Sequence, residues 1–222
     1  METRLYRERF DADEVAKKDR LWKVLCADFF QKFVPEDSTV LDIGAGYCEF
    51  INNIKARQKY AVDLNEDARR FARPEVEVFV CSAHRLDFLS DNSIDIAFMS
   101  NFLEHLKSKE EVLQVLREVH RVCKIGGGIL ILQPNIRYVY QQYWDFFDHH
   151  IPLSDKSLTE ALVVTGFEID KIYPKFLPYT TKSRLPQYDF LVKLYLKIPL
   201  AWQVMGKQQS MWARSISYNT DL

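Results

Sequence analysis

The chain has 222 residues, of which 47% are hydrophobic and 27% are charged, and its formal net charge is −1. This length suits one α/β domain built around a single core. A near-neutral charge argues against a protein that holds nucleic acid, because binding to phosphates requires a clear excess of lysine and arginine.

The cysteines and the hydropathy pattern indicate where the protein works. The four cysteines, Cys26, Cys48, Cys81 and Cys123, form no C-x-x-C pair, so we expect free thiols in a reducing compartment. The first 20 residues lack the apolar stretch of a secretory signal. No apolar run approaches the roughly 20 residues that a membrane-spanning helix needs. We therefore expect a soluble, cytoplasmic protein.

The first part of the chain predicts a helical cap over 1–37. Apolar side chains recur at near-helical spacing over 11–33, and Pro35 favours the end of that helix. Strand and helix patterns then alternate: we expect strands at 38–44, 59–65, 76–83, 94–101 and 126–134, and helices at 48–57, 66–73 and 108–124. This alternation predicts a mostly parallel sheet with helices on both faces.

The second part of the chain has a different pattern. An aromatic-rich stretch covers 136–150, and a helix is expected between Ser154 and Gly166. Further expected elements are a strand at 167–174, a proline-containing loop at 174–186, an apolar helical segment with lysines at 188–206 and a last strand at 208–215. The segment 188–206 is expected to pack on the sheet or at a dimer interface. Contact with a membrane surface is the alternative.

The stretch VLDIGAGYCEF (40–50) reads as a strand, a glycine turn and the start of a helix, as in sites for nucleotide-like cofactors. In the dinucleotide pattern G-x-G-x-x-G the third glycine is here Glu49, and a carboxylate repels a pyrophosphate. Asp42 lies inside the apolar strand, where a cationic ligand would compensate its charge. S-adenosylmethionine carries an ammonium and a sulfonium and no phosphate. Asp63, after the second strand, can accept hydrogen bonds from ribose hydroxyls of either cofactor.

Four segments in order resemble the class I S-adenosylmethionine-dependent methyltransferase family. They are VLDIGAGYC, AVDLN, VCSAHRLDFLSDNSIDIAFMSNFLEHL and LREVHRVCKIGGGILILQPN. The resemblance implies an α/β, doubly wound, Rossmann-like fold with a seven-stranded, mostly parallel sheet. The last strand would be antiparallel and lie between the fifth and the sixth. The methyltransferase domain would cover 38–222, with acceptor-site insertions at 136–206.

The resemblance also implies S-adenosylmethionine as cofactor and S-adenosylhomocysteine as product. The methionine end of the cofactor would be held by Asp42, Gly44 and Gly46 and lined by Ala45 and Tyr47. Asp63 would bind the ribose and Leu64 would cover the adenine. The adenine would also lie beside Ser82, Ala83 and His84, and Asn101 would close the site. Three positions depart from the family pattern. Ser82 replaces a usual aspartate, Cys48 replaces a usual glycine and Asp87 replaces a usual proline.

Histidines are the candidate catalytic residues, because imidazole titrates near neutral pH and can act as a general base. His149 and His150 follow the aromatic stretch, and either could deprotonate or orient an acceptor. His105 follows the fourth strand, and for it a structural role is favoured. A metal bound by DFFDHH is not expected, because adjacent histidines are poor co-ligands and no third ligand is obvious. Tyr138, Tyr143 and Trp144 are expected either to wall an acceptor pocket or to pack in the core.

We therefore predict an S-adenosylmethionine-dependent methyltransferase that acts on a small-molecule acceptor, at a hydroxyl group. Downstream segments such as FFDHHIPLSDKSLTEALVVTGFEI loosely resemble a bacterial branch associated with glycans or secondary metabolites. Alternatives are N-methylation of a protein or small molecule, a cofactor-binding regulatory protein without activity, and a nicotinamide-dependent oxidoreductase. The oligomeric state is expected to be a monomer or a homodimer.

Overall fold

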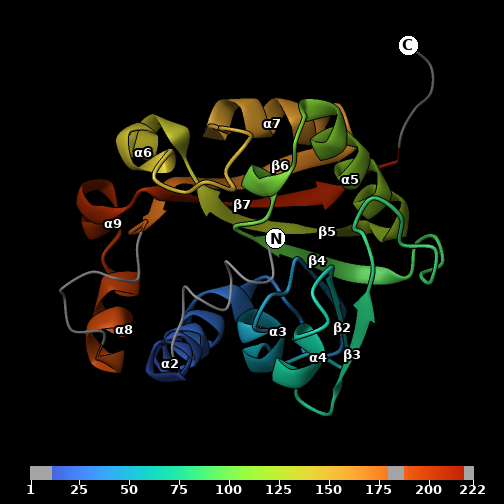
Figure 1. Cartoon of the computed structure of the whole chain (residues 1–222), viewed down its shortest axis with the longest axis horizontal. Helices are drawn as coiled ribbons and strands as arrows, with labels where there is room; N and C mark the ends of the chain where they lie inside the picture. Colours follow the sequence, from blue (N-terminus) through green and yellow to red (C-terminus); the bar gives the residue numbers. More distant parts are fainter. Residues whose placement is uncertain (1–11, 180–187, 218–222) are drawn as a thin grey trace.

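The computed structural model describes residues 12–179 and 188–217. In this part of the chain, seven strands form one sheet with the order β3-β2-β1-β4-β5-β7-β6 (Figure 1). The strands are β1 Thr39–Ile43, β2 Gln58–Asp63, β3 Val76–Val80, β4 Ile94–Ser100, β5 Cys123–Pro134, β6 Phe167–Leu177 and β7 Gln208–Ser215. Strands β1 to β5 are parallel to one another, whereas β7 runs antiparallel to both β5 and β6. The predicted sheet, with its last strand between the fifth and the sixth, is confirmed.

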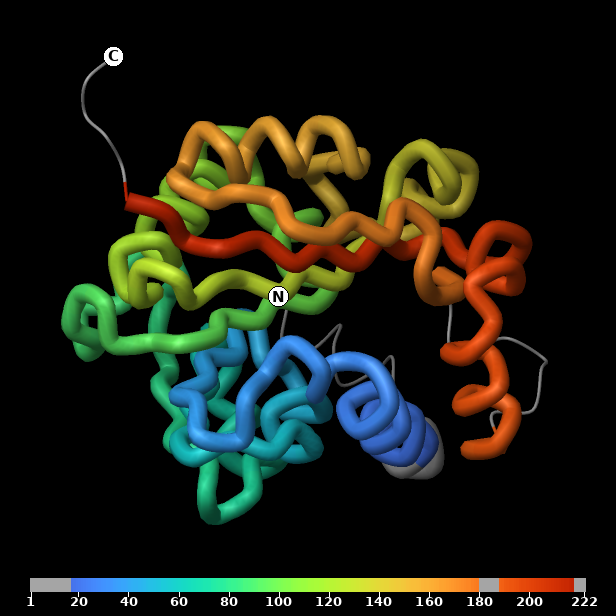
Figure 2. The backbone as a smooth tube through the Cα atoms, turned by 180° about the vertical axis from the view of Figure 1, so that it is seen from behind, coloured from blue at the N-terminus to red at the C-terminus, as the bar shows by residue number. Residues whose placement is uncertain are grey.

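Helices cover both faces of the sheet. They are α2 Ala12–Asp28, α3 Glu49–Asn53, α4 Ala68–Phe71, α5 Lys109–Val122, α6 Ile136–Tyr143, α7 Asp155–Val163, α8 Asp189–Lys197 and α9 Pro199–Met205, with short 3-10 turns η1 Phe30–Lys32 and η2 Leu103–His105. One face packs against α5 and α7, and the opposite face packs against α2, α3, α8 and α9. From behind, α2 and α8 again lie side by side (Figure 2).

The helix ends follow the local signals in the sequence. The Ser108 hydroxyl caps α5 by accepting from the backbone N–H of Glu111 at 3.1 Å. The Ser154 hydroxyl caps α7, where Ser157 completes a capping box. The single helical segment expected at 188–206 is instead broken at Ile198, because Pro199 has no N–H to continue the helix.

Other boundaries differ from the expectation. Helix α3 ends at Asn53, four residues before the predicted end, and β6 extends to Leu177 into the predicted loop. Helix α6 has no counterpart among the predicted elements, because its aromatic residues carry no strong helical signal of their own. Residues 180–186 of that predicted loop lie outside the described residues.

An aromatic cluster packs helix α2 against the sheet, next to the helix α3 that follows the glycine turn. The rings of Phe50 and Phe98 stack with centroids 3.6 Å apart, and Phe30 and Trp22 meet Phe98 edge-on at 5.4 and 5.9 Å. These side chains come from α2, η1, α3 and β4, so the cluster holds α3 and the turn before it against the sheet. The predicted division between a cap at 1–37 and a domain at 38–222 stays a prediction.

Candidate active site

The glycine turn connects β1 to α3 through three residues in the left-handed region. Gly44, Gly46 and Cys48 have φ of 68°, 52° and 59°. The backbone N–H groups of Gly44 and Ala45 both donate to the Val62 carbonyl, at 2.8 and 3.2 Å. The turn is therefore fixed to the end of β2, and glycine is the residue that adopts such a conformation at little cost.

Asp63 ends β2 and holds the same turn from the other side. One carboxylate oxygen accepts from the Gly46 N–H and the other from the Asn65 N–H, both at 2.8 Å. A carboxylate offers about four acceptor positions, so two backbone donors leave capacity for the hydroxyls of a ribose. The following residue, Leu64, is 68% exposed, and its contact with the adenine stays a prediction.

Three carboxylates surround the turn. Asp42 is only 3% exposed, and its pKa is raised first by burial and then by the neighbouring carboxylates of Glu49 and Asp63. Burial also raises the pKa of Glu49, which the Lys18 ammonium partly offsets. Because each of these negative charges raises the cost of the others, a bound cation would stabilise the group. The ammonium and sulfonium of S-adenosylmethionine fit this concentration of negative charge.

The predicted adenine contacts follow β3. Ser82 Oγ lies 2.7 Å from Nδ1 of His84, and Ala83 between them is buried. Ser82 and His84 also line an open pocket with Cys81 and Glu111. Further along the sheet edge, Asn101 follows β4 with a φ of 47° and donates to the Ser100 hydroxyl at 3.3 Å.

These predicted cofactor residues share one edge of the sheet. Strands β3, β2, β1 and β4 are parallel neighbours in that order, so their carboxyl ends meet there. In open α/β sheets, ligands bind at this edge. The individual contacts to S-adenosylmethionine stay predictions.

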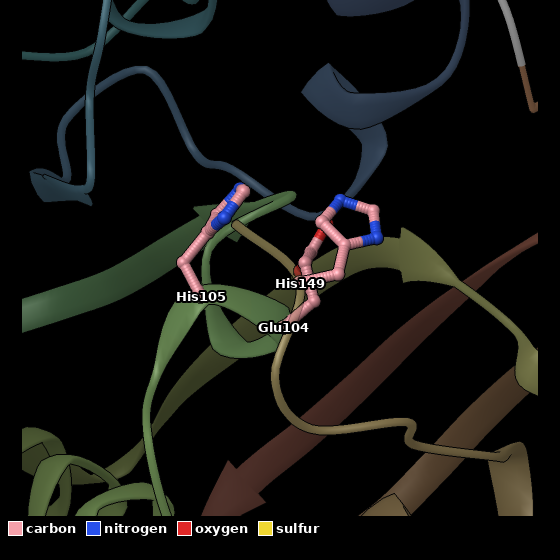
Figure 3. A group of neighbouring side chains, drawn as sticks. All are labelled: Glu104, His105 and His149. Carbon is pink, nitrogen blue, oxygen red and sulfur yellow. The ribbon is translucent and has the colours of Figure 1, made fainter. Parts of the chain in front are cut away.

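Beside this edge, the structure brings together three polar side chains, Glu104, His105 and His149 (Figure 3). Glu104 and His105 lie in η2, directly after β4, whereas His149 follows α6. One potential ligand atom of each lies within 4.8 Å of the others, and the two imidazole centroids are 5.2 Å apart. His150 is different: its side chain is exposed, and its backbone N–H donates to the Glu104 carbonyl at 2.7 Å. Sequence reasoning did not single out Glu104; its only signal is its place beside His105.

The aromatic residues of α6 serve in part as packing. Tyr143 is 1% exposed, burial raises its pKa, and its hydroxyl donates to the Ile151 carbonyl at 2.5 Å. The centroids of the Tyr143 and His149 rings are 4.6 Å apart, so the buried tyrosine packs against the imidazole. Trp144 is 58% exposed, and the Lys175 ammonium lies over the Tyr138 ring at 4.6 Å. The burial of Tyr143 favours the packing alternative, and the acceptor contacts of these aromatics stay predictions.

The comparison with known proteins adds to this geometry. Residues 41–131 match the family model described as a methyltransferase domain. That match covers the glycine turn, Asp63, Ser82 and Glu104. Residues 41–131 are therefore similar to a methyltransferase domain, in agreement with the resemblance to class I S-adenosylmethionine-dependent methyltransferases. The predicted resemblance to this family, the fold class and the cofactor are confirmed.

The curated relatives that match this chain are distant in sequence. The demethylmenaquinone methyltransferase of Listeria welshimeri is 25% identical over 109 residues, which make up 45% of this chain and 45% of that protein. The chain thus spans less than half the length of this curated relative.

Two solved structures share the fold. A SAM-dependent methyltransferase from Archaeoglobus fulgidus has a TM-score of 0.62 and 21% identity, covering 84% of this chain and 90% of that one. A Haloferax volcanii methyltransferase complex with the Trm112 activator has a TM-score of 0.67 and 15% identity, covering 91% and 93% of the two chains.

Membrane contact and self-association depend on the helices and on the apolar side chains that they expose. No helix in the described part of the chain has the length and apolar character to span a membrane. Helices α8 and α9 expose several apolar side chains, namely Phe190, Leu194, Leu200 and Val204. A membrane surface and a second copy of the chain stay predicted partners for this face, and the cytoplasmic location also stays a prediction.

Proposed function

We propose that this chain transfers the methyl group of S-adenosylmethionine to a hydroxyl of a small-molecule acceptor. The observation that carries the proposal is the group formed by Glu104, His105 and His149 beside the glycine turn. Strands β1 and β4 are paired in register up to Ile43 and Met99, so the residues that follow them are neighbours at the sheet edge. Polar groups that can accept a proton therefore lie next to the proposed cofactor site.

The chemistry requires little from the protein beyond alignment and proton removal. The acceptor oxygen attacks the methyl carbon as the carbon–sulfur bond breaks, and the bonding electrons stay on sulfur. The sulfonium supplies the activation, and the chain orients the two reactants and excludes water. The hydroxyl proton must leave, and an imidazole or a carboxylate with a pKa near neutral can accept it. Burial raises the pKa of Glu104 to about 7, which suits this task.

Histidines 105 and 149 are better placed for this role than His150. Both imidazoles lie in the same group, whereas the His150 side chain is exposed. Of the two sequence candidates that follow α6, we therefore favour His149. His105 becomes a second candidate of equal standing.

The charge of the chain and its relatives bear on the class of acceptor. The net charge of −1 favours a small molecule over nucleic acid. A sugar or a secondary metabolite stays our proposed acceptor, and the name of the Listeria welshimeri relative adds a demethylated quinone to the compounds worth testing. A regulatory protein without activity would need no proton acceptors beside the cofactor, so the polar group favours an enzyme. N-methylation stays the alternative reaction.

Calorimetric titration tests the cofactor, and turnover tests the residues. We expect S-adenosylmethionine and S-adenosylhomocysteine to bind and NAD not to bind. An acceptor screen with radiolabelled methyl donor should cover sugars, phenols, quinols and amines. His149→Ala and His105→Ala should each lower turnover at least 10-fold with cofactor affinity retained. His150→Ala should have a smaller effect. Binding of NAD alone, or unchanged turnover in both the His105 and the His149 variants, would contradict the proposal.

A further inference from the structure

The group of Glu104, His105 and His149, seen in Figure 3, has the composition of a metal site. We propose that it binds one divalent first-row transition-metal ion of the zinc or manganese type. The group combines two imidazoles and one carboxylate, a set of three ligands that suits these ions. The binding of the ion is independent of the proposed methyl transfer.

The backbone holds the two segments of the site together. The N–H groups of His150 and Ile151 both donate to the Glu104 carbonyl, at 2.7 and 3.2 Å. The segment that carries His149 is thus fixed directly to the residue that supplies the carboxylate. In a tetrahedral zinc site with bonds of about 2.0–2.1 Å, neighbouring ligand atoms lie about 3.4 Å apart. The present separations of these ligand atoms are at most 4.8 Å, so binding of the ion would draw them closer together.

The hydrogen bonds of the two histidines orient both rings in the way that metal ligands require. Nδ1 of His105 lies 2.9 Å from the Asp148 carbonyl oxygen, and Nδ1 of His149 lies 3.0 Å from the Tyr143 carbonyl oxygen. A carbonyl only accepts, so Nδ1 carries the proton, and in the neutral ring Nε2 carries the lone pair. Histidines that bind metals nearly always donate their other ring N–H to a carbonyl or carboxylate.

The third ligand is the buried carboxylate of Glu104, which a bound cation would stabilise. Glu104 is 3% exposed, and its Oε2 has no hydrogen-bond partner within the described residues. A buried polar atom without a partner destabilises the folded chain, and it does so more strongly if the group is charged. A divalent cation between Glu104 and the two imidazoles would satisfy this oxygen.

One side of the site stays open. Glu104 and His149 are buried, but the side chain of His105 is 31% exposed. Three protein ligands with an accessible fourth position are the arrangement of catalytic rather than structural metal sites. Magnesium is disfavoured, because it prefers oxygen ligands in octahedral geometry.

The open position suggests a role that does rest on the proposed function. An acceptor hydroxyl bound there would lose its proton more easily, because a metal ion lowers the pKa of an oxygen ligand. The proton would leave to water, and the oxygen would then attack the methyl carbon of S-adenosylmethionine. The two histidines would in that case act as ligands rather than as the base itself.

Metal binding is tested on the full chain after removal of metals with a chelator. Titration with ZnCl2 and MnCl2 should show one ion per chain, with MgCl2 binding at least 100-fold more weakly. Glu104→Gln, His105→Ala and His149→Ala should each weaken zinc binding about 100-fold or more, since even outer-shell changes cost 10–100-fold. His150→Ala removes the neighbouring, exposed imidazole and should leave zinc affinity unchanged. Cobalt(II) should give visible absorption bands in the wild-type chain that Glu104→Gln abolishes.

Circular dichroism establishes that each variant is folded, and the partly exposed His105 provides a decisive variant if Glu104→Gln does not fold. No zinc binding by the folded chain, or binding that none of the three ligand variants weakens, would overturn the proposal. A parallel titration with S-adenosylmethionine separates the two ideas. Cofactor binding without metal binding rejects the metal site alone, whereas metal binding without cofactor binding rejects the proposed function alone.

Discussion

Gly44 lies against the ring of Phe102, so closely that a Cβ at position 44 would stand 2.5 Å from Cδ2 of that ring. The glycine belongs to the turn after β1, and Phe102 lies between β4 and η2, two residues before Glu104. This contact joins the proposed cofactor turn to the polar group on the next strand. A change at either residue is therefore expected to shift both the glycine turn and the segment that carries Glu104 and His105.

Replacement of Gly44 by alanine should damage both stability and cofactor binding. The new Cβ must displace the Phe102 ring, and the φ of 68° adds about 1–2 kcal/mol of strain. For a chain of this size we expect a fall in Tm of about 6 °C or more. Gly126→Ala is the matched control, because Gly126 has a φ of 84° and a Cβ at that position would meet nothing within 4 Å. Thermal melts that show equal losses for both variants would contradict the importance of the Phe102 contact.

Cys48 occupies a backbone conformation that suits glycine, the residue usual at this place in the family. Its φ is 59°, its side chain is fully buried, and its Sγ lies 3.5 Å from the Ala68 carbonyl. Cys48→Gly relieves the strain but loses the buried thiol, so the free energy of unfolding should change by less than about 1 kcal/mol. Cys48→Val forces a β-branched residue into this region and should lose about 2 kcal/mol or more. Urea denaturation measures both, and a valine variant as stable as the wild type would count against this interpretation.

Asp42 should destabilise the chain in the absence of cofactor. Burial, then Glu49 and Asp63, raise its pKa in the folded state, so the folded chain binds more protons than the unfolded one above the ordinary carboxyl pKa. Stability then falls as pH rises. Asp42→Asn should remove this loss and raise the free energy of unfolding at about pH 8 by about 1 kcal/mol or more, with the gain fading toward about pH 4. It should also weaken S-adenosylmethionine binding about 10-fold, because the cation loses a negative neighbour.

Asp95 provides a control of opposite sign for that experiment. Burial alone would raise its pKa, but hydrogen bonds from Lys124 and from the Thr39 N–H lower it below the usual value. A lowered carboxyl pKa contributes stability that is present above the unfolded pKa and is lost as pH falls through the folded one. Asp95→Asn should therefore destabilise the chain at neutral pH. If both variants shift stability in the same direction, the assigned environment of Asp42 is wrong.

Much of the fold could be predicted from local patterns. The periodicity of α5, with Ser108 at its start, depends on residues three and four apart, and the glycine turn depends on a few consecutive residues. Helix α6 and the break at Ile198 were missed. The aromatic residues of α6 have weak helix propensity, so the packing of Val139 and Tyr143 into the core decides that element.

By itself the sequence determined the order of strands and helices, the glycine turn with its acids and the family to which they point, because these features arise between near neighbours in the chain. Only the tertiary structure decided that Glu104 and His105 meet His149, and that Tyr143 supports that histidine from the core. His105 and the carbonyl of Asp148 are 43 residues apart in sequence. Contacts over such separations form only when the segments that follow β4 and α6 lie side by side at one edge of the sheet. The packing of the whole sheet determines their positions.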